Sequence, residues 1–155
     1  MKKNRLFWII GILGFIFDQL TKFWIVQQLP QIGDTIPLIP NIFHLTYVTN
    51  TGAAFSFFSG GVFWLRWLSF AVSLGLIILG FLGRMRFFEQ LGYGFILAGA
   101  LGNGWDRFFL GYVVDFLDFR FIDFPVFNFA DVFINIGVIC LIFATFPTKS
   151  LTKKR

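Results

Sequence analysis

Four long apolar runs divide this chain of 155 residues, and they constrain its fold more than any other feature. A helix needs about 20 apolar residues to cross the hydrocarbon core of a bilayer. The composition agrees with spanning helices, because 57% of the residues are apolar and only 14% are charged, against about 25% charged in an average soluble domain. We therefore expect a membrane all-α fold, a four-helix transmembrane bundle forming one integral membrane domain over residues 1–155. The expected spans are residues 6–26, 62–82, 87–105 and 129–146.

Basic residues at the ends of these runs indicate how the chain is oriented. Nine of the thirteen lysines and arginines precede the first run, fill the link between the second and third, or follow the fourth. Lysine and arginine in short flanking segments stay on the cytoplasmic side. We expect both termini in the cytoplasm and residues 27–61 and 106–128 outside. The first run is expected to remain as a span, because no small-x-small cleavage site follows residues 15–17.

Polar side chains lie at a similar depth in three of the four runs. With a rise of about 1.5 Å per residue, each lies ~20 to ~26 Å from the cytoplasmic end of its run, and therefore in the outer leaflet. An ionisable group at this depth usually faces the bundle interior and marks a function. The pair four residues apart on the first run either neutralises itself and anchors the helix or takes part in a site. The four residues are Asp18, Lys22, Asn103 and Asp131.

Two segments between the runs have the pattern of short strands. Residues 43–58 read FHLTYVTNTGAAFSFF and contain a turn signal at Asn50-Thr51-Gly52. Residues 112–124 read YVVDFLDFRFIDF and partly alternate apolar and charged residues. Because unpaired strand edges cannot lie in hydrocarbon, we expect a small extracytoplasmic β-sheet and loop region at or above the outer interface.

Two aspartates are candidates for a catalytic pair. Asp115 follows the third run, and Asp131 opens the fourth, where Asn128 can cap the helix and the helix dipole favours a carboxylate. If the segment after the third run folds back onto the fourth, the two carboxyl groups meet and share a proton. One then takes a proton from water while the other donates to a scissile carbonyl. Each also has a structural interpretation, Asp131 as a cap residue and Asp115 as an interface charge.

The remaining ionisable residues indicate less. We expect Asp118 and Asp123 to be solvated loop acids and Asp106 to pair locally with Arg107, which lies one turn from Asn103 and could line a site with it. One cysteine and one histidine exclude a zinc site built from those residues, and we expect no metal or cofactor. The basic residues form no stripe on a soluble scaffold, so no nucleic-acid partner is expected.

Five motifs, taken together, resemble the lipoprotein signal peptidases, or signal peptidase II. They occur in the family's order and cover nearly the whole chain. The resemblance implies a bacterial membrane aspartyl endopeptidase that cleaves the signal peptide from prolipoproteins just before a cysteine carrying diacylglycerol. The motifs are DQLTK at 18–22, NTGAAFS at 50–56, GALGNGWDR at 99–107, GYVVDF at 111–116 and FNFAD at 127–131.

The resemblance also implies roles for single residues. Asp115 and Asp131 are expected to be the catalytic pair, and residues 48–58 are expected to cover the site. The expected partners are a prolipoprotein with a diacylglyceryl cysteine and membrane lipids, and no oligomer is required. The expected location is the cytoplasmic (inner) membrane, with the active site toward its outer face. The expected substrate-binding residues are Asn50, Asn103, Arg107, Asn128, Asp18 and Lys22.

The chain departs from the family pattern at two positions. Ala98 stands where a glycine often occurs, which changes packing, and Val132 replaces a small hydroxyl residue beside Asp131. Two other classes of function remain open. A small channel or transporter would need polar residues running from one face of the membrane to the other, whereas the inner halves of the spans are almost wholly apolar. A non-enzymatic membrane subunit would tolerate replacement of its acids by amides.

Overall fold

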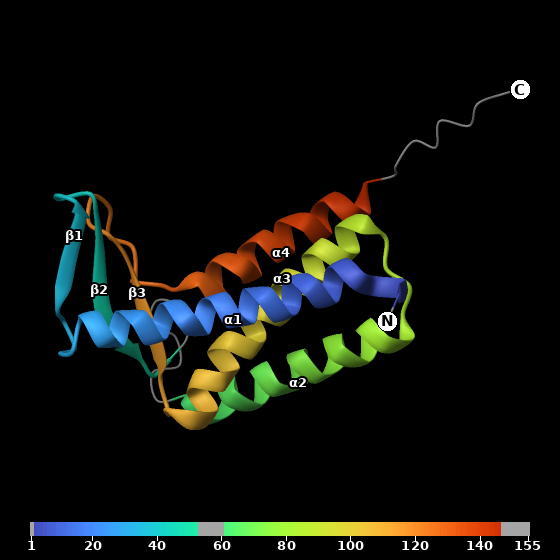
Figure 1. Cartoon of the computed structure of the whole chain (residues 1–155), viewed down its shortest axis with the longest axis horizontal. Coiled ribbons are helices and arrows are strands. Elements are labelled where there is room, and N and C mark those ends of the chain that lie inside the picture. The colour runs from blue at the N-terminus through green and yellow to red at the C-terminus, as the bar shows by residue number, and fades with distance from the viewer. Residues whose placement is uncertain (1, 53–60, 147–155) are drawn as a thin grey trace, which may run out of the picture.

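The computed structural model describes residues 2–52 and 61–146, which form four α-helices and a three-stranded sheet (Figure 1). This confirms the four predicted helices and the small β region. A short 3-10 helix, Lys2–Asn4, precedes the first helix. The elements are α1 (Arg5–Gln28), β1 (Thr35–Ile39), β2 (Phe43–Asn50), α2 (Val62–Leu82), α3 (Phe87–Phe109), β3 (Val113–Phe119) and α4 (Phe129–Thr145).

The helices match the apolar runs closely, with one consequential difference. Helix α3 continues to Phe109 rather than ending near residue 105, so Asn103, Asp106 and Arg107 all project from regular helix. Among the described helices, α1 and α2 are long and apolar enough to cross a membrane, and α4 is apolar but shorter. Helix α3 packs against the other three helices and is the centre of the bundle.

The sheet has the antiparallel order β1-β2-β3. The sequence analysis did not include β1, whose Pro37 is compatible with an edge strand but gives no strand pattern. A bulge between Leu45 and Val48 changes the register, and beyond it Val48 lies opposite Asp115. A buried apolar cluster joins the sheet to the end of α1; its members are Ile25, Leu29, Leu45, Tyr47, Val114, Phe116 and Leu117.

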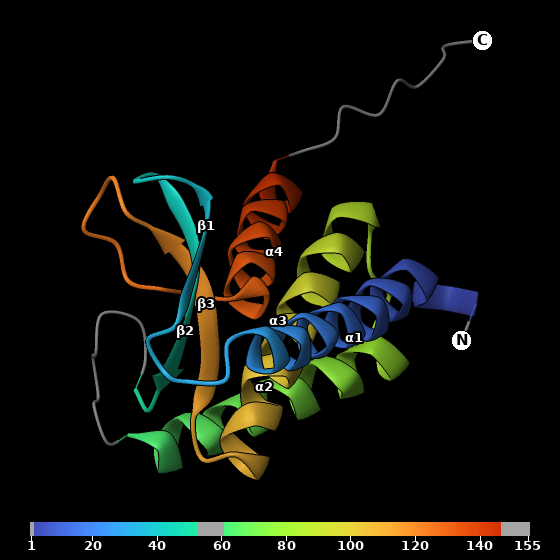
Figure 2. The same ribbon diagram turned by 60° about the vertical axis from the view of Figure 1, so that its left-hand side comes forward.

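The sheet and the N-terminus lie at opposite ends of the bundle (Figures 1 and 2). At the N-terminal end, the Asn4 side chain donates to the carbonyl oxygens of Gly80, at 2.9 Å, and Gly83, at 3.0 Å. Its oxygen accepts from the Met85 N–H at 3.2 Å. This buried residue therefore ties the start of α1 to the link between α2 and α3. At the sheet end, α1 contacts β2 and β3, and α3 contacts β3.

Candidate active site

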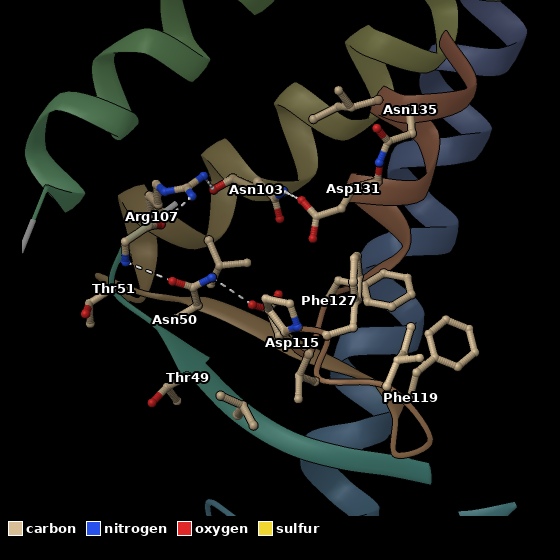
Figure 3. Close-up of a pocket in the computed structure, with 18 residues that line it drawn as sticks. Thr49, Asn50, Thr51, Asn103, Arg107, Asp115, Phe119, Phe127, Asp131 and Asn135 are labelled. Carbon is tan, nitrogen blue, oxygen red and sulfur yellow. Dashed lines mark hydrogen bonds between the residues drawn. The ribbon is translucent and has the colours of Figure 1, made fainter. Parts of the chain in front are cut away.

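A pocket of about 620 Å³ lies where the sheet meets α3 and α4 (Figure 3). Asp115 reaches it from β3 and Asp131 from the first turn of α4, so the structure brings the two predicted acids to one cavity. The wall combines these polar groups with apolar side chains of the segment that links β3 to α4. Other lining residues include Asn50, Gly52, Asn103, Arg107, Phe119, Phe127 and Asn135.

Asp115 is buried, and both of its carboxyl oxygens accept hydrogen bonds. The Asn50 amide donates to Oδ2 at 2.9 Å and the Asn128 amide donates to Oδ1 at 2.6 Å. Burial, followed by the nearby carboxylate of Asp131, raises the pKa of Asp115 to about 7. The two amide hydrogen bonds and the positive charge of Lys22 act against that rise. Asp115 is therefore suited to hold a proton near neutral pH.

Asp131 occupies a different environment at the N-terminus of α4. Its backbone N–H donates to Asn128 Oδ1 at 3.1 Å, and its Oδ2 accepts from the Asn128 N–H at 3.2 Å. This reciprocal capping box confirms the predicted cap. Its Oδ1 accepts from the Asn103 amide at 2.8 Å. Donors and the helix dipole thus surround a carboxylate that opens onto the pocket.

Arg107 lies at the edge of the same pocket and is buried. It donates to the Gly52 carbonyl oxygen at 3.1 Å and to the Asn103 carbonyl oxygen at 3.3 Å. Its Nε has no hydrogen-bond partner among the residues that the structure describes. The predicted local pair with Asp106 is wrong, because Asp106 forms its ion pair with Lys22 instead.

Asp18 and Lys22 lie outside the set of pocket-lining residues, at 0% and 3% exposure. The Lys22 ammonium contacts Asp18 at 2.9 Å, Asp106 at 2.8 Å and Asn103 Oδ1 at 3.1 Å. Gln19 donates to Asp106 Oδ1 at 3.0 Å. The sequence analysis missed Asp106 and Gln19 as members of this buried cluster. The spacing of Asp106, three residues after Asn103, puts both on one helix face and could have indicated the contact.

The two remaining loop acids differ from each other. Asp118 was predicted to be solvated, but this is wrong: it is 7% exposed and accepts from Thr46 Oγ1 at 2.6 Å and from Arg120. The reason is that β3 extends to Phe119 and pairs Asp118 with β2. Asp123 is exposed, as expected. Of the predicted cover at 48–58, residues 53–58 lie outside the described part of the chain.

The arrangement can support acid–base chemistry at a peptide bond. Two carboxyl groups in different environments face one cavity, so one can be ionised while the other holds a proton. Such a pair can both activate a water and protonate a reacting group. Among the described residues, no group of three or more His, Cys, Asp or Glu side chains is placed to hold a metal ion.

Comparisons with known proteins give the same picture over the whole chain. Residues 10–147 match the family model described as signal peptidase (SPase) II. A lipoprotein signal peptidase of Gloeothece citriformis is 68% identical, covering 99% of this chain and 97% of its own. One of Microcystis aeruginosa is 66% identical, with coverage of 96% and 97%.

Two solved structures described as a bacterial membrane enzyme share the fold. One has a TM-score of 0.80 and 35% sequence identity, covering 95% of this chain and 91% of its own. The other has a TM-score of 0.77 and 34% identity, covering 94% and 92%. The family model matches residues 10–147 of this chain, and the relatives are highly identical to it. The chain therefore belongs to the signal peptidase II family of aspartic proteases.

Proposed function

We propose that Asp115 and Asp131 are the catalytic pair with which this bacterial membrane protease removes the signal peptide from lipoproteins. One observation supports this most directly: both carboxyl groups line one pocket, and three asparagine amides donate to them. We further propose that the scissile bond precedes a cysteine carrying diacylglycerol, as the family resemblance implies.

In the proposed reaction, the ionised Asp131 takes a proton from a water in the pocket. The water oxygen attacks the scissile carbonyl carbon, and the protonated Asp115 donates to the carbonyl oxygen as charge develops there. Asp131 then donates the proton it took from water to the leaving amine, the C–N bond breaks, and Asp115 recovers a proton from a hydroxyl group of the collapsing tetrahedral intermediate. The pKa of Asp115, raised to about 7, supports its assignment as the acid.

The polar residues around the pair have proposed roles in binding. Asn50, Asn103 and Asn128 hold the carboxyl groups in position, since each donates to one of them. Arg107, whose buried Nε has no hydrogen-bond partner within residues 2–52 and 61–146, is suited to bind a carbonyl oxygen of the substrate backbone or lipid. Asp18 and Lys22 belong to the same site but support it from beneath the pocket.

The fold also supports a proposed placement in the membrane. In that placement all four helices cross the bilayer as one integral membrane domain, and the sheet lies at the extracytoplasmic interface. Lys3, Arg5, Arg84 and Arg86 then lie at the cytoplasmic end, where the start of α1 contacts the link between α2 and α3. A substrate held by its own helix and acyl chains would present its cleavage site at the depth of the pocket. No oligomer is required.

A gel-shift assay with a diacylglyceryl-modified prolipoprotein tests the catalytic assignment. Asp115→Asn and Asp131→Asn are each expected to abolish cleavage while the protein still folds and inserts. Asp123→Asn, which changes an exposed acid, is the matched control and should cleave at the wild-type rate. Substantial turnover by either of the first two variants would remove the pair from the mechanism. Equal cleavage of an unlipidated substrate would contradict the role of the lipid.

A further inference from the structure

The three asparagines around the catalytic pair share one geometrical requirement. A carboxamide donates from its nitrogen and accepts at its oxygen, so a group bound at the oxygen decides which way the nitrogen points. For Asn50, the Gly52 N–H donates to the amide oxygen at 2.8 Å. For Asn128, the Asp131 N–H does so at 3.1 Å. In both cases the backbone fixes the amide and directs its NH₂ group toward Asp115.

Among the described residues no backbone N–H has this role for Asn103, whose amide is oriented by side chains instead. Its Oδ1 accepts from the Lys22 ammonium at 3.1 Å and from the Asn128 amide at 3.0 Å. Its NH₂ group therefore faces Asp131, to which it donates at 2.8 Å. The reverse orientation would set the NH₂ group against two donors and the oxygen against a carboxylate.

The surroundings of Lys22 leave its ammonium group one arrangement. An ammonium has three N–H donors, and three acceptors lie within 3.1 Å: Asp18 Oδ2, Asp106 Oδ2 and Asn103 Oδ1. Asp18 is itself held by the Ala130 N–H at 2.9 Å, and Asp106 by the Val114 N–H at 3.2 Å. The cation is thus fixed between the start of α4 and the start of β3, and its third donor is directed at Asn103.

We infer that Lys22 is a positioning residue for catalysis, whose ammonium group holds the Asn103 amide in the orientation that donates a hydrogen bond to Asp131. This inference rests on the proposed catalytic pair and assigns Lys22 a role other than contact with substrate. It also explains a charged residue buried at this depth, because an apolar side chain there would donate nothing to Asn103 Oδ1 and would leave, of the described donors, the Asn128 amide alone to orient it. Without Lys22, the Asn103 amide can turn and set its oxygen toward the Asp131 carboxylate.

The main experiment removes the hydrogen bond without changing the net charge of the cluster. The variant Asp18→Asn/Lys22→Met loses one cation and one anion together and leaves Asp106. We expect kcat on the lipidated prolipoprotein to fall about tenfold to hundredfold, the range for one hydrogen bond to a charged group, with KM within about twofold. The control Thr21→Val changes a residue next to Lys22 whose hydroxyl donates to the carbonyl oxygens of Phe17 and Asp18 within α1, and should leave both constants near wild type.

One further readout separates positioning from a structural role. In an Asn103→Ala background, the same double substitution should cost little further activity. Additive losses, or a change in KM alone, would overturn the inference.

A second variant keeps the inference testable if Asp18→Asn/Lys22→Met fails to fold, because it leaves Lys22 and all three of its acceptors in place. Asn103→Asp keeps an oxygen for Lys22 but sets its other oxygen against Asp131. It is expected to lose about tenfold or more in kcat at neutral pH. Wild-type kcat in this variant would overturn the inference. Failure of the proposed function would appear elsewhere, as no cleavage by the wild-type enzyme or as turnover by Asp115→Asn.

Discussion

At the scale of single residues, the two aspartates differ because different elements supply them. Asp115 lies in the middle of a strand whose neighbours remove it from water, and its donors are side chains. Asp131 lies in the first turn of a helix, where a backbone N–H and the helix dipole favour its charge. In the proposed mechanism, strand and helix thus divide the roles of acid and base between two chemically identical side chains.

The raised pKa of Asp115 predicts a loss of activity on the alkaline side. If protonated Asp115 is the acid, kcat/KM should fall by about tenfold per pH unit above about 7. A cleavage assay in proteoliposomes between pH 5 and pH 9 measures this fall. A profile that stays level to pH 9 would contradict the assignment of Asp115 as the acid.

The same pKa predicts how stability depends on pH. The folded protein keeps the Asp115 proton up to about pH 7, whereas an unfolded chain releases it near pH 4. The folded state binds more protons between these values, so this contribution to the free energy of unfolding falls as pH rises from about 4 to 7. Thermal unfolding in detergent should show this fall in stability with pH in the wild type and a weaker fall in Asp115→Asn. An equal dependence of stability on pH in the variant would contradict the assignment of the fall to Asp115.

Asn128 combines a structural role as the α4 cap with its proposed role of positioning Asp115, and two substitutions separate them. Asn128→Ala should lose activity and about 1 kcal/mol of stability, because it removes both the cap and the donor to Asp115. Asn128→Ser retains an oxygen that can cap the Asp131 N–H but has no NH₂ group. It should keep most of the stability and still lose activity. Stability is measured by thermal unfolding. Equal losses in the two variants would show that the loss in Asn128→Ala does not come from removal of the cap.

At the scale of elements, glycines bring α3 close enough to its neighbours to place Asn103 beside Asp131. A methyl group on Gly137 would meet Gly92 O at 2.7 Å and the Ile96 N–H nitrogen at 3.0 Å, and one on Gly99 would collide with the Ala130 carbonyl oxygen. Small residues permit this kind of backbone contact between membrane helices. Ala98 fits the same packing, because its methyl group faces Gly14 of α1.

Gly137→Ala is expected to separate α3 from α4. Besides the Ile96 side chain, two of the three nearest obstructing atoms belong to backbone, which cannot move aside, so we expect a loss of about 1 to 3 kcal/mol in stability and a fall in activity. Gly75→Ala is the matched control, since an added methyl group there meets nothing within 4 Å among the described residues. It should be neutral or stabilising, because alanine favours helix more than glycine does. Comparable losses in both variants, by thermal unfolding in detergent, would refute the packing argument.

The sequence predicted the elements better than it predicted their contacts. Helices in lipid satisfy their own backbone groups, so an apolar run of sufficient length predicts one locally, as for α2. Strand β1 pairs with β2 across a short turn, but its own sequence carries no alternation that would predict a strand. At the site, the cap at Asn128 was predictable from local spacing. Spacing also puts Asp106 on the helix face of Asn103, but its pairing with Lys22 depends in addition on how α1 packs against α3, which local spacing does not give.

At the scale of the whole molecule, charge is sorted between the two ends of the bundle. The end of α2 and the start of α1 meet where Lys3 donates to the Leu82 carbonyl oxygen, and Arg86 reaches the Ala144 carbonyl oxygen of α4. Two described segments that carry basic residues, around Lys3 and around Arg86, therefore lie at one end, beside the end of α4. The sheet lies at the other end (Figure 1), and the pocket lined by Asp115 and Asp131 lies beside it. By the positive-inside rule, we propose that the basic end is cytoplasmic.

This orientation is testable with single cysteines, because the chain has only Cys140 to remove. In a Cys140→Ala background, Gln31→Cys lies beside the sheet and Arg84→Cys lies in the link between α2 and α3; both positions are exposed. A membrane-impermeant maleimide added to intact spheroplasts should label position 31 and leave position 84 unlabelled until the membrane is opened. Cleavage activity of each variant shows that it has folded. The opposite labelling pattern would place the pocket on the cytoplasmic face. The cleavage site of a substrate that still carries its signal peptide would then lie on the other side of the membrane from the pocket.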